Sequence, residues 1–471
     1  MKGAFLTAVA LAALAACGGG DGEARWNLVV VSLDTTRADR LGCYGNPRDV
    51  TPEIDAFAAE AARFADCRAA STLTGPSHRS LFTSHHVTRH GILKNGHPSR
   101  SPYTLAGLLR AAGWRTAGFV GGGPMTGKFG LSQGFDRWVE SSAITEAHEG
   151  HLERSLGPGL EWIDAQDGKP FFLFLHGFDP HCPYTPPAEV RGLWSGAYAG
   201  TLDPSGRCGQ EGFGELQASG AVGTEEIGFL RDLYDEELHS ADAAFGRLLA
   251  GLRERGLLER TVVVFVSDHG ESLGEHAWIG HGRSSELELR VPLIVRFPGG
   301  AWSGVRKDPV MGVDLAPTLL AALGVAAPPG MQGRDLMPSV RGETELPADR
   351  IRFSRTGNHF AFLFDGRWKL VYLQERERRM YRELYDLHED PGETRNLFLE
   401  GGEEGRGRTS ELLDRARAWL ASQAAEDSAF AATILAVKID EADRAGLAVL
   451  GYADDEIAGG QESGQEQDGD R

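Results

Sequence analysis

The chain has 471 residues, with 67 acidic and 48 basic side chains, a formal net charge of −19 and 41% hydrophobic residues. This composition is typical of a folded globular protein and excludes both a disordered chain and a chain with many membrane spans. The excess of negative charge also argues against nucleic acid as a partner, because phosphate contacts require a basic surface.

The first residues have the pattern of an export signal. Lys2 precedes an apolar run that is too short to span a membrane as a helix. The run ends in Leu14-Ala15-Ala16-Cys17, which resembles the lipobox of bacterial lipoproteins. We therefore expect a signal peptide at 1–16, a lipid on Cys17 that anchors the exported protein to the bacterial cell envelope, and a Gly-rich flexible tether at 17–26. An ordinary cleavage site before a cysteine is the alternative.

Export would place the other cysteines in an oxidising compartment, where disulfides form. They are Cys43, Cys67, Cys182 and Cys208. Three ways of pairing four cysteines are open, and so is the alternative of free buried thiols. Five cysteines in all are too few for a fold that depends on disulfides.

Strands and helices are predicted to alternate along the first two thirds of the chain. Continuous apolar runs predict buried strands, and apolar residues at helical spacing predict helices. In chain order the predictions are a strand at 27–33, helices at 51–62 and 104–112, strands at 116–120 and 171–175, a helix at 227–255, strands at 261–266 and 291–297, and a helix at 314–323. This alternation predicts an α/β fold with a large, mostly parallel central sheet flanked by helices.

The last part of the chain changes character. Alternating aromatic and polar residues, as in Trp368-Lys369-Leu370-Val371-Tyr372, predict a smaller C-terminal antiparallel sheet with a helix after it. We expect a main α/β domain at 27–345, a C-terminal subdomain at 346–452 and a disordered acidic tail at 453–471. The Gly-rich stretch at 188–222 has no periodicity and is expected to be a surface insertion over one end of the main sheet.

Side chains suited to metal binding follow two of the predicted strands. Asp34 comes directly after the first strand, and Ser267-Asp268-His269 follows the strand at 261–266. Functional groups in open α/β sheets lie at the carboxyl ends of strands. Carboxylate oxygens and imidazole nitrogens are ligands for divalent metals. Capping of the following helices explains Asp34 or Asp268 singly, but it does not explain Asp268 together with His269, so the pattern predicts a metal site.

A third polar segment surrounds Thr74. Gly75-Pro76 predicts a tight turn directly after this threonine, and the stretch 80–82 is expected to open a helix. A hydroxyl near a helix N-terminus is well placed to meet an anion.

In order along the chain, these motifs resemble the sulfatase family of the alkaline phosphatase superfamily. The matching blocks include Asp34 with Arg37-Ala38-Asp39, Leu41-Gly42-Cys43-Tyr44-Gly45, Thr51-Pro52, Asp179-Pro180-His181-Cys182-Pro183-Tyr184, Ser267-Asp268-His269-Gly270-Glu271, His281-Gly282 and Asp314-Leu315-Ala316-Pro317-Thr318-Leu319. The resemblance implies a central sheet flanked by helices, a smaller C-terminal sheet subdomain, and an enzyme that hydrolyses sulfuric or phosphoric esters.

The resemblance also implies a metal centre. Asp34, Asp268 and His269 match the family's metal ligands, and Thr35 stands where the family usually has a second aspartate ligand. One divalent ion is therefore expected. Ca²⁺ is the ion usual in the family, and the change to Thr35 leaves Mn²⁺ or Zn²⁺ open.

The catalytic positions carry over with departures from the family pattern. His181 and His281 match the two basic residues that hold the ester anion. Thr74 stands where the family has the cysteine or serine that becomes formylglycine, and His78 stands where the family has arginine, with Arg79 one place later. Threonine cannot be converted to the aldehyde by the same maturation. Its hydroxyl can still be a nucleophile if a metal lowers the effective pKa of that hydroxyl.

We therefore expect a metal-dependent hydrolase of sulfuric or phosphoric esters with Thr74 as nucleophile, acting on a small-molecule or glycan ester. Two alternatives stay open. One is a phosphodiesterase or phosphoglycerol-type transferase at the cell envelope, and the other is a non-catalytic sulfatase-like binding lipoprotein. Glu271 is expected to orient a neighbouring histidine rather than to bind a metal. The glycines at 121–123 replace a Lys-x-His element usual in the family.

Overall fold

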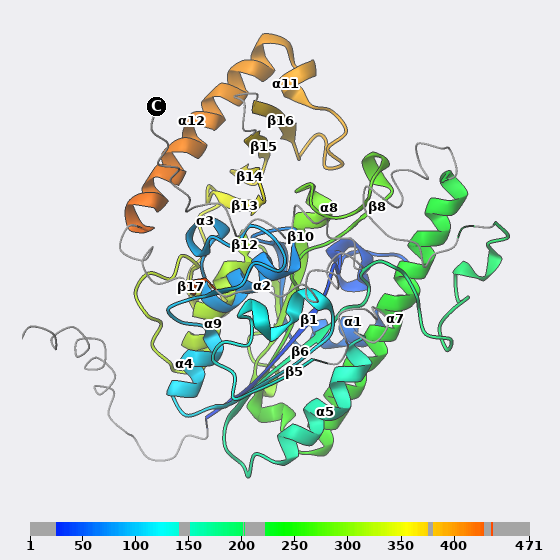
Figure 1. Ribbon diagram of the computed structural model, residues 1–471, viewed down its shortest axis with the longest axis vertical. Helices are drawn as coiled ribbons and strands as arrows, with labels where there is room; N and C mark the ends of the chain where they lie inside the picture. Colours follow the sequence, from blue (N-terminus) through cyan, green and yellow to red (C-terminus); the bar gives the residue numbers. More distant parts are fainter. Residues whose placement is uncertain are drawn as a thin grey trace, which may run out of the picture.

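The computed structural model describes residues 25–140, 151–200, 202, 222–374, 380–427 and 435–436. Its largest unit is a nine-stranded sheet, drawn in the middle of Figure 1. The strands of this sheet are β1 (Asn27–Leu33), β2 (Ala62–Arg68), β4 (Arg115–Val120), β5 (Arg137–Glu140), β6 (Phe171–Gly177), β7 (Thr261–Ser267), β10 (Arg290–Arg296), β11 (Gly304–Arg306) and β12 (Val310–Met311). Their order is β11-β2-β10-β7-β1-β6-β4-β5, and β12 also pairs with β2.

The central sheet is mostly parallel, as predicted. β1 lies between β6 and β7 and is parallel to both, and β4 is parallel to β5 and β6. β10 is antiparallel to its neighbours β7 and β2. All the strands predicted for this sheet are confirmed, with only small shifts at their ends.

Helices cover both faces of the sheet. The helices α1 (Pro52–Ala59), α5 (Leu152–Asp164) and α7 (Thr224–Glu254) pack on one face, and α2 (Thr74–Thr83), α4 (Leu105–Ala111) and α9 (Leu315–Ala322) pack on the other. Successive side chains of a strand point to opposite faces. In β1, accordingly, Val29 and Val31 belong to the first core, whereas Leu28 and Val30 belong to the second. Burial on both faces explains why the sequence of β1 is largely apolar.

The C-terminal part is a separate four-stranded antiparallel sheet, at the top of Figure 1. It consists of β13 (Arg352–Thr356), β14 (His359–Phe364), β15 (Trp368–Gln374) and β16 (Met380–Asp386), and α12 (Gly402–Asp427) packs against it. The predicted antiparallel sheet and following helix are thus confirmed. The N–H of Thr72 donates to Thr356 Oγ1 at 2.9 Å, which ties β13 to the segment that carries Thr74.

Shorter elements connect the larger ones. They are α3 (Val87–His90), α8 (Glu286–Leu289), α10 (Met337–Val340), α11 (Leu397–Glu400), β3 (Ser99–Arg100), β8 (Ser272–Leu273), β9 (Ile279–Gly280) and β17 (Leu435–Ala436). β8 and β9 form a small antiparallel hairpin between the central strands β7 and β10.

The elements that were not predicted include β2 and α5, and one helix was predicted in the wrong place. β2 was missed because its sequence mixes charged residues with apolar ones, and α5 was missed because it contains Pro158 between two glycines. The helix expected to open near residue 80 begins at Thr74 instead, so that Gly75-Pro76 forms its first turn rather than a turn before it.

The remaining expectations concern the ends of the chain and the cysteines. The predicted signal peptide, Cys17 and the acidic tail lie outside the described residues, as does most of the predicted insertion. Cys43 and Cys67 are free thiols, and Cys182 is disulfide-bonded. Among the described helices, none has both the length and the apolar character needed to cross a bilayer.

Candidate active site

The first cluster forms where the neighbouring strands β1 and β7 end. Leu33 pairs with Ser267 in the parallel register, so that the residues after them, Asp34 and Asp268, emerge side by side. With His269 they form a buried group whose potential ligand atoms all lie within 4.8 Å of one another. The structure therefore brings the three predicted metal ligands together at the carboxyl edge of the sheet.

Thr74 lies against this cluster at the first position of α2. Its hydroxyl donates to Asp34 Oδ2 at 3.3 Å and lies 3.5 Å from His269 Nε2. The backbone N–H of Gly75 donates to the Asn95 side chain at 2.7 Å, which fixes the turn into the helix. Because the side chain of Thr74 is fully buried, this hydroxyl is held at the three potential ligands.

Within the described part of the chain, each carboxylate of the cluster keeps one oxygen atom without a hydrogen-bond partner. Asp34 Oδ1 and Asp268 Oδ2 are buried and have no hydrogen-bond partner among the described residues. Burial, together with repulsion from Asp268, raises the pKa of Asp34 well above its ordinary value, and burial raises the pKa of Asp268 to about 6. His269 Nδ1 donates to the Gly270 carbonyl at 3.0 Å, so its Nε2 presents a lone pair to the carboxylates. Two carboxylates, an imidazole lone pair and a hydroxyl fit a divalent cation.

Thr35 contributes to the cluster through its backbone. Its φ of 51° lies in the left-handed region, which is strained for a β-branched residue. In this conformation its N–H donates to Asp268 Oδ1 at 3.3 Å, and its carbonyl accepts from the Tyr234 hydroxyl at 2.9 Å. Thr35 Oγ1 is buried and has no hydrogen-bond partner within the described chain. The ligand role of Thr35 stays a prediction.

His78 lies behind the cluster, one helical turn after Thr74. Its Nδ1 is 2.9 Å from the Thr74 carbonyl oxygen and 3.4 Å from Asp268 Oδ2, and the ring is fully buried. This position suits a residue that orients Asp268, and the predicted catalytic role of His78 stays a prediction. The neighbouring Arg79 is directed elsewhere, because its guanidinium donates to the Phe129 carbonyl at 3.3 Å.

His176 is a site residue that sequence reasoning missed. It lies in β6, and its Nδ1 donates to the Gly121 carbonyl at 2.9 Å. Its Nε2 lies 3.7 Å from Asp34 Oδ2. The sequence does contain a signal for His176. It directly follows the predicted strand at 171–175, just as Asp34 directly follows the strand at 27–33.

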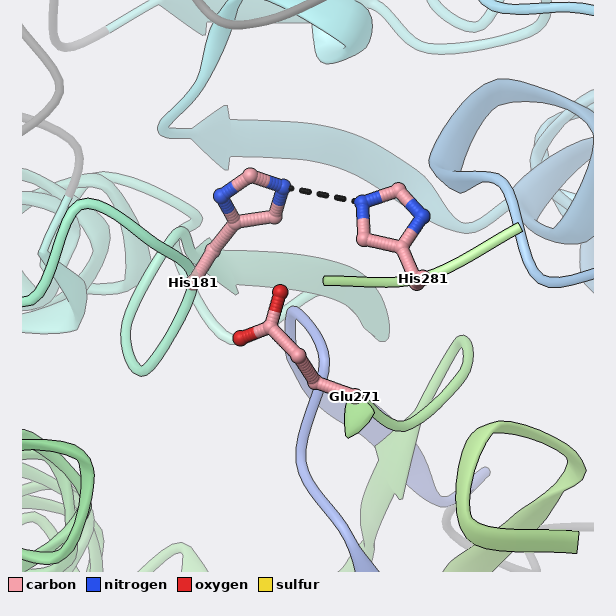
Figure 2. Close-up of side chains that lie close together, drawn as sticks. All are labelled: His181, Glu271 and His281. Atoms are coloured by element: carbon pink, nitrogen blue, oxygen red, sulfur yellow. Dashed lines mark hydrogen bonds between the residues drawn. The ribbon is translucent and has the colours of Figure 1, made fainter. Parts of the chain in front are cut away.

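A second cluster adjoins the first and contains His181, Glu271 and His281 (Figure 2). The β8–β9 hairpin places Glu271 and His281 next to each other, and His181 reaches them from the loop after β6. The Nε2 atoms of the two histidines are 3.1 Å apart, and all three potential ligand atoms lie within 4.8 Å of one another. The rings of His281 and His269 have centroids 4.4 Å apart, so the two clusters are in direct contact through these rings.

Glu271 is the acidic member of the second cluster. The Tyr184 hydroxyl donates to its Oε2 at 2.7 Å, and burial raises its pKa to about 8. Burial also lowers the pKa of His181 to about 3, with a further contribution from His281. The Glu271 carboxylate lies within 4.8 Å of the potential ligand nitrogens of two histidines, and its predicted role in orienting a histidine stays a prediction.

Comparison with known proteins gives consistent results. The family model described as Sulfatase matches residues 26–325, and one described as N-sulphoglucosamine sulphohydrolase, C-terminal, matches residues 274–409. The chain is 25% identical over 498 residues to N-acetylglucosamine-6-O-sulfatase of Bacteroides thetaiotaomicron, a match that covers 84% of this chain and 87% of that protein.

Two solved structures show the same fold. One is a complex with the substrate D-glucosamine-2-N,6-O-disulfate, with a TM-score of 0.65 and 23% identity, covering 83% of this chain and 97% of that chain. The other is phosphonate monoester hydrolase of Agrobacterium radiobacter, with a TM-score of 0.70 and 19% identity, covering 85% of this chain and 96% of that chain.

Proposed function

Because the chain belongs to the sulfatase family, whose members hydrolyse sulfuric esters, we propose that it is a metal-dependent ester hydrolase with Thr74 as the nucleophile. The observation that carries this proposal is the hydroxyl of Thr74, buried at the start of α2 within 3.3 Å of Asp34 and 3.5 Å of His269. No other hydroxyl of the described residues is hydrogen-bonded to both of these side chains.

The reaction has two steps. Thr74 Oγ forms a bond to the sulfur or phosphorus atom of the ester, the bond to the leaving alcohol oxygen breaks, and the proton of Thr74 moves toward Asp34 Oδ2. The result is a sulfo- or phospho-threonine. Water then attacks the same sulfur or phosphorus atom, and the bond from that atom to Thr74 Oγ breaks. The proton returns from Asp34 to Thr74 Oγ, and sulfate or phosphate is released, or a phosphate monoester when the substrate is a diester.

The residues that would hold the metal are Asp34, Asp268 and His269, with Thr35 beside them. A divalent ion bound there supplies positive charge next to the Thr74 hydroxyl and to the group that is transferred. Ca²⁺ is the ion that the family resemblance implies, whereas the imidazole of His269 is a ligand that Mn²⁺ and Zn²⁺ also accept. His78, whose Nδ1 lies 3.4 Å from Asp268 Oδ2, is proposed to orient the Asp268 carboxylate.

His181 and His281 are proposed to hold the anionic group of the ester. The His281 ring packs against His269, with centroids 4.4 Å apart, and His181 Nε2 lies 3.1 Å from His281 Nε2, so both histidines lie next to the first cluster. The substrate is proposed to be a sulfated sugar or a phosphate ester. The sugar is supported by the relatives, one named for a sugar sulfate and one bound to a glucosamine disulfate.

Phosphate esters or diesters are expected to be hydrolysed at least as fast as sulfate esters. A sulfo-threonine has no aldehyde through which to expel sulfate, whereas a phospho-threonine can be attacked by water beside a metal. The measurement is kcat/KM of the purified enzyme on p-nitrophenyl sulfate, p-nitrophenyl phosphate, bis-p-nitrophenyl phosphate and 6-O-sulfated glucosamine. Efficient cleavage of the sulfates with no cleavage of either phosphate would contradict this chemical argument.

We also propose that the protein is exported and anchored to the cell envelope by a lipid on Cys17. The lipobox pattern at the end of the apolar run supports this location. Mass spectrometry of the protein from its own host should show an N-terminal cysteine with acyl chains, and Cys17→Ala should release the protein from the membrane fraction. Recovery of wild-type protein with an intact N-terminus, or with cleavage at another residue, would refute the anchor.

A further inference from the structure

The hydrogen bonds of His181 and His281 fix which ring nitrogen carries the hydrogen. His181 Nδ1 contacts the Cys182 carbonyl, and His281 Nδ1 lies 2.8 Å from the Thr72 carbonyl oxygen. A carbonyl oxygen only accepts, so both Nδ1 atoms are donors, and in the neutral rings both Nε2 atoms carry lone pairs. These lone pairs face each other across 3.1 Å (Figure 2), a contact that is repulsive unless a cation or a proton lies between them.

Glu271 closes the same space from a third side. Figure 2 shows its carboxylate pointing toward the two rings. Its Oε2 accepts from Tyr184, and its Oε1 is buried without a hydrogen-bond partner within the described residues. In its ionised form a carboxylate at this place repels an anion and attracts a cation, and a bound cation would itself favour that form. With Glu271 ionised, the two nitrogen lone pairs and the carboxylate give the space between them a negative electrostatic potential. The family resemblance alone implies an anion contact at this place.

We propose that His181 Nε2, His281 Nε2 and Glu271 bind a second divalent metal ion, of the zinc class, next to the Asp34 cluster. Two histidines and one glutamate are a ligand set of zinc sites that keep one position open for water or substrate. Two nitrogens on one tetrahedral zinc ion lie roughly 3.3 Å apart, since each Zn–N bond is about 2.0–2.1 Å. The observed separation of 3.1 Å needs little adjustment to reach this geometry.

The groups around these ligands match those of a metal site. Histidine ligands usually donate their second nitrogen to a carbonyl or carboxylate, and ligating carboxylates are themselves hydrogen-bonded. Here His181 donates to the Cys182 carbonyl and His281 donates to the Thr72 carbonyl. The Glu271 carboxylate accepts from the Tyr184 hydroxyl. His281 is partly exposed, which leaves one side of the cluster open to solvent.

A second ion would also explain how two neutral histidines can hold an anionic ester, because the ion rather than the rings would contact the ester oxygen. The contact between the ion and the ester oxygen rests on the proposed function, whereas binding of the ion does not. Ion binding and Thr74 chemistry are therefore measured separately, by ion content and by turnover.

The test is the number of zinc ions bound per chain. Full-length protein is freed of metal with a chelator, equilibrated with Zn²⁺, passed through a desalting column and analysed by inductively coupled plasma mass spectrometry. Wild-type protein should hold two ions per chain. Glu271→Gln should hold one, because it removes the charged ligand of the second cluster and leaves Asp34, Asp268 and His269 in place.

His281→Ala is the second variant, since a partly exposed side chain can be removed with less risk to folding, and it should also hold one ion. Glu275→Gln is the matched control. Glu275 pairs with Arg37 and Arg231 and is not a member of the cluster, so this variant should hold two ions. One ion per chain in the wild type with no loss in Glu271→Gln or His281→Ala would overturn the proposal, and so would two ions in all variants.

Discussion

Replacing Thr74 with alanine should reduce kcat by several powers of ten on every ester that the wild-type enzyme hydrolyses. Loss of the nucleophile in a cooperating set of residues typically has an effect of this size. Thr74→Ser should keep partial activity, because the hydroxyl remains at the start of α2 and only a methyl group is lost. The measurement is single-turnover and steady-state kinetics of both variants beside the wild type.

The matched control for this experiment is Thr83→Ala. Thr83 lies at the other end of α2, is equally buried, and donates its hydroxyl to the Arg79 carbonyl at 2.7 Å. Loss of this hydrogen bond should destabilise the fold by about 1 kcal/mol and leave the rate of the folded enzyme close to that of the wild type. Full activity of Thr74→Ala would dismiss Thr74 as the nucleophile.

Asp268→Asn should abolish both hydrolysis and the stabilisation that a divalent ion gives to the protein at the first cluster. Without an ion, Asp34 and Asp268 are two buried carboxylates that repel each other, so the neutral amide should not lower the stability of the metal-free protein. With an ion, the wild type should gain about 2.7 kcal/mol at an ion concentration about 100 times Kd.

The measurement for Asp268→Asn is thermal unfolding with and without added Ca²⁺ or Mn²⁺, because Zn²⁺ would also bind the proposed second cluster. Asp242→Asn serves as the control, because Asp242 is buried in α7, where it accepts from the N–H groups of Glu53 and Ile54. This control should keep the ion-dependent rise in melting temperature, even if its own melting temperature is lower. A wild-type melting temperature that neither ion changes would argue against the metal centre.

Much of the fold could be predicted because the central strands are buried on both faces. β1 and β7 are largely apolar, which predicts buried strands. Asp34 and Asp268 follow these strands, and functional groups in such sheets lie at the carboxyl ends of strands. The predicted bounds of β1 agree with the structure because both ends of that run are marked by polar residues.

The elements that were missed depend on tertiary packing. In α5, Pro158 and its neighbouring glycines disfavour a helix locally, yet Leu156 and Trp162 of that helix pack into the core beneath the sheet. β2 contains several charged residues, and one of them, Arg68, pairs with Glu286 from a distant segment. Local sequence carries no signal for such contacts.

The second cluster could not be predicted as a unit for the same reason. His181 and Glu271 are far apart in sequence and meet only because the loop after β6 and the β8–β9 hairpin fold over the same edge of the sheet. The orientation of the two histidine rings is set by backbone carbonyl groups, at Cys182 and Thr72. The family resemblance assigned each histidine to the ester anion, and Glu271 was expected to orient one histidine, but the meeting of all three side chains was not predicted.

The most direct test of the account is to trap the covalent intermediate. Enzyme mixed with excess substrate and quenched in acid should yield, after proteolysis, a peptide with Thr74 that is heavier by one phosphoryl or sulfuryl group, and fragmentation should place the group on Thr74. The adduct should be absent from Thr74→Ala and present in Thr74→Ser. Steady turnover of the wild type with an adduct on another residue would contradict the central claim that Thr74 is the nucleophile.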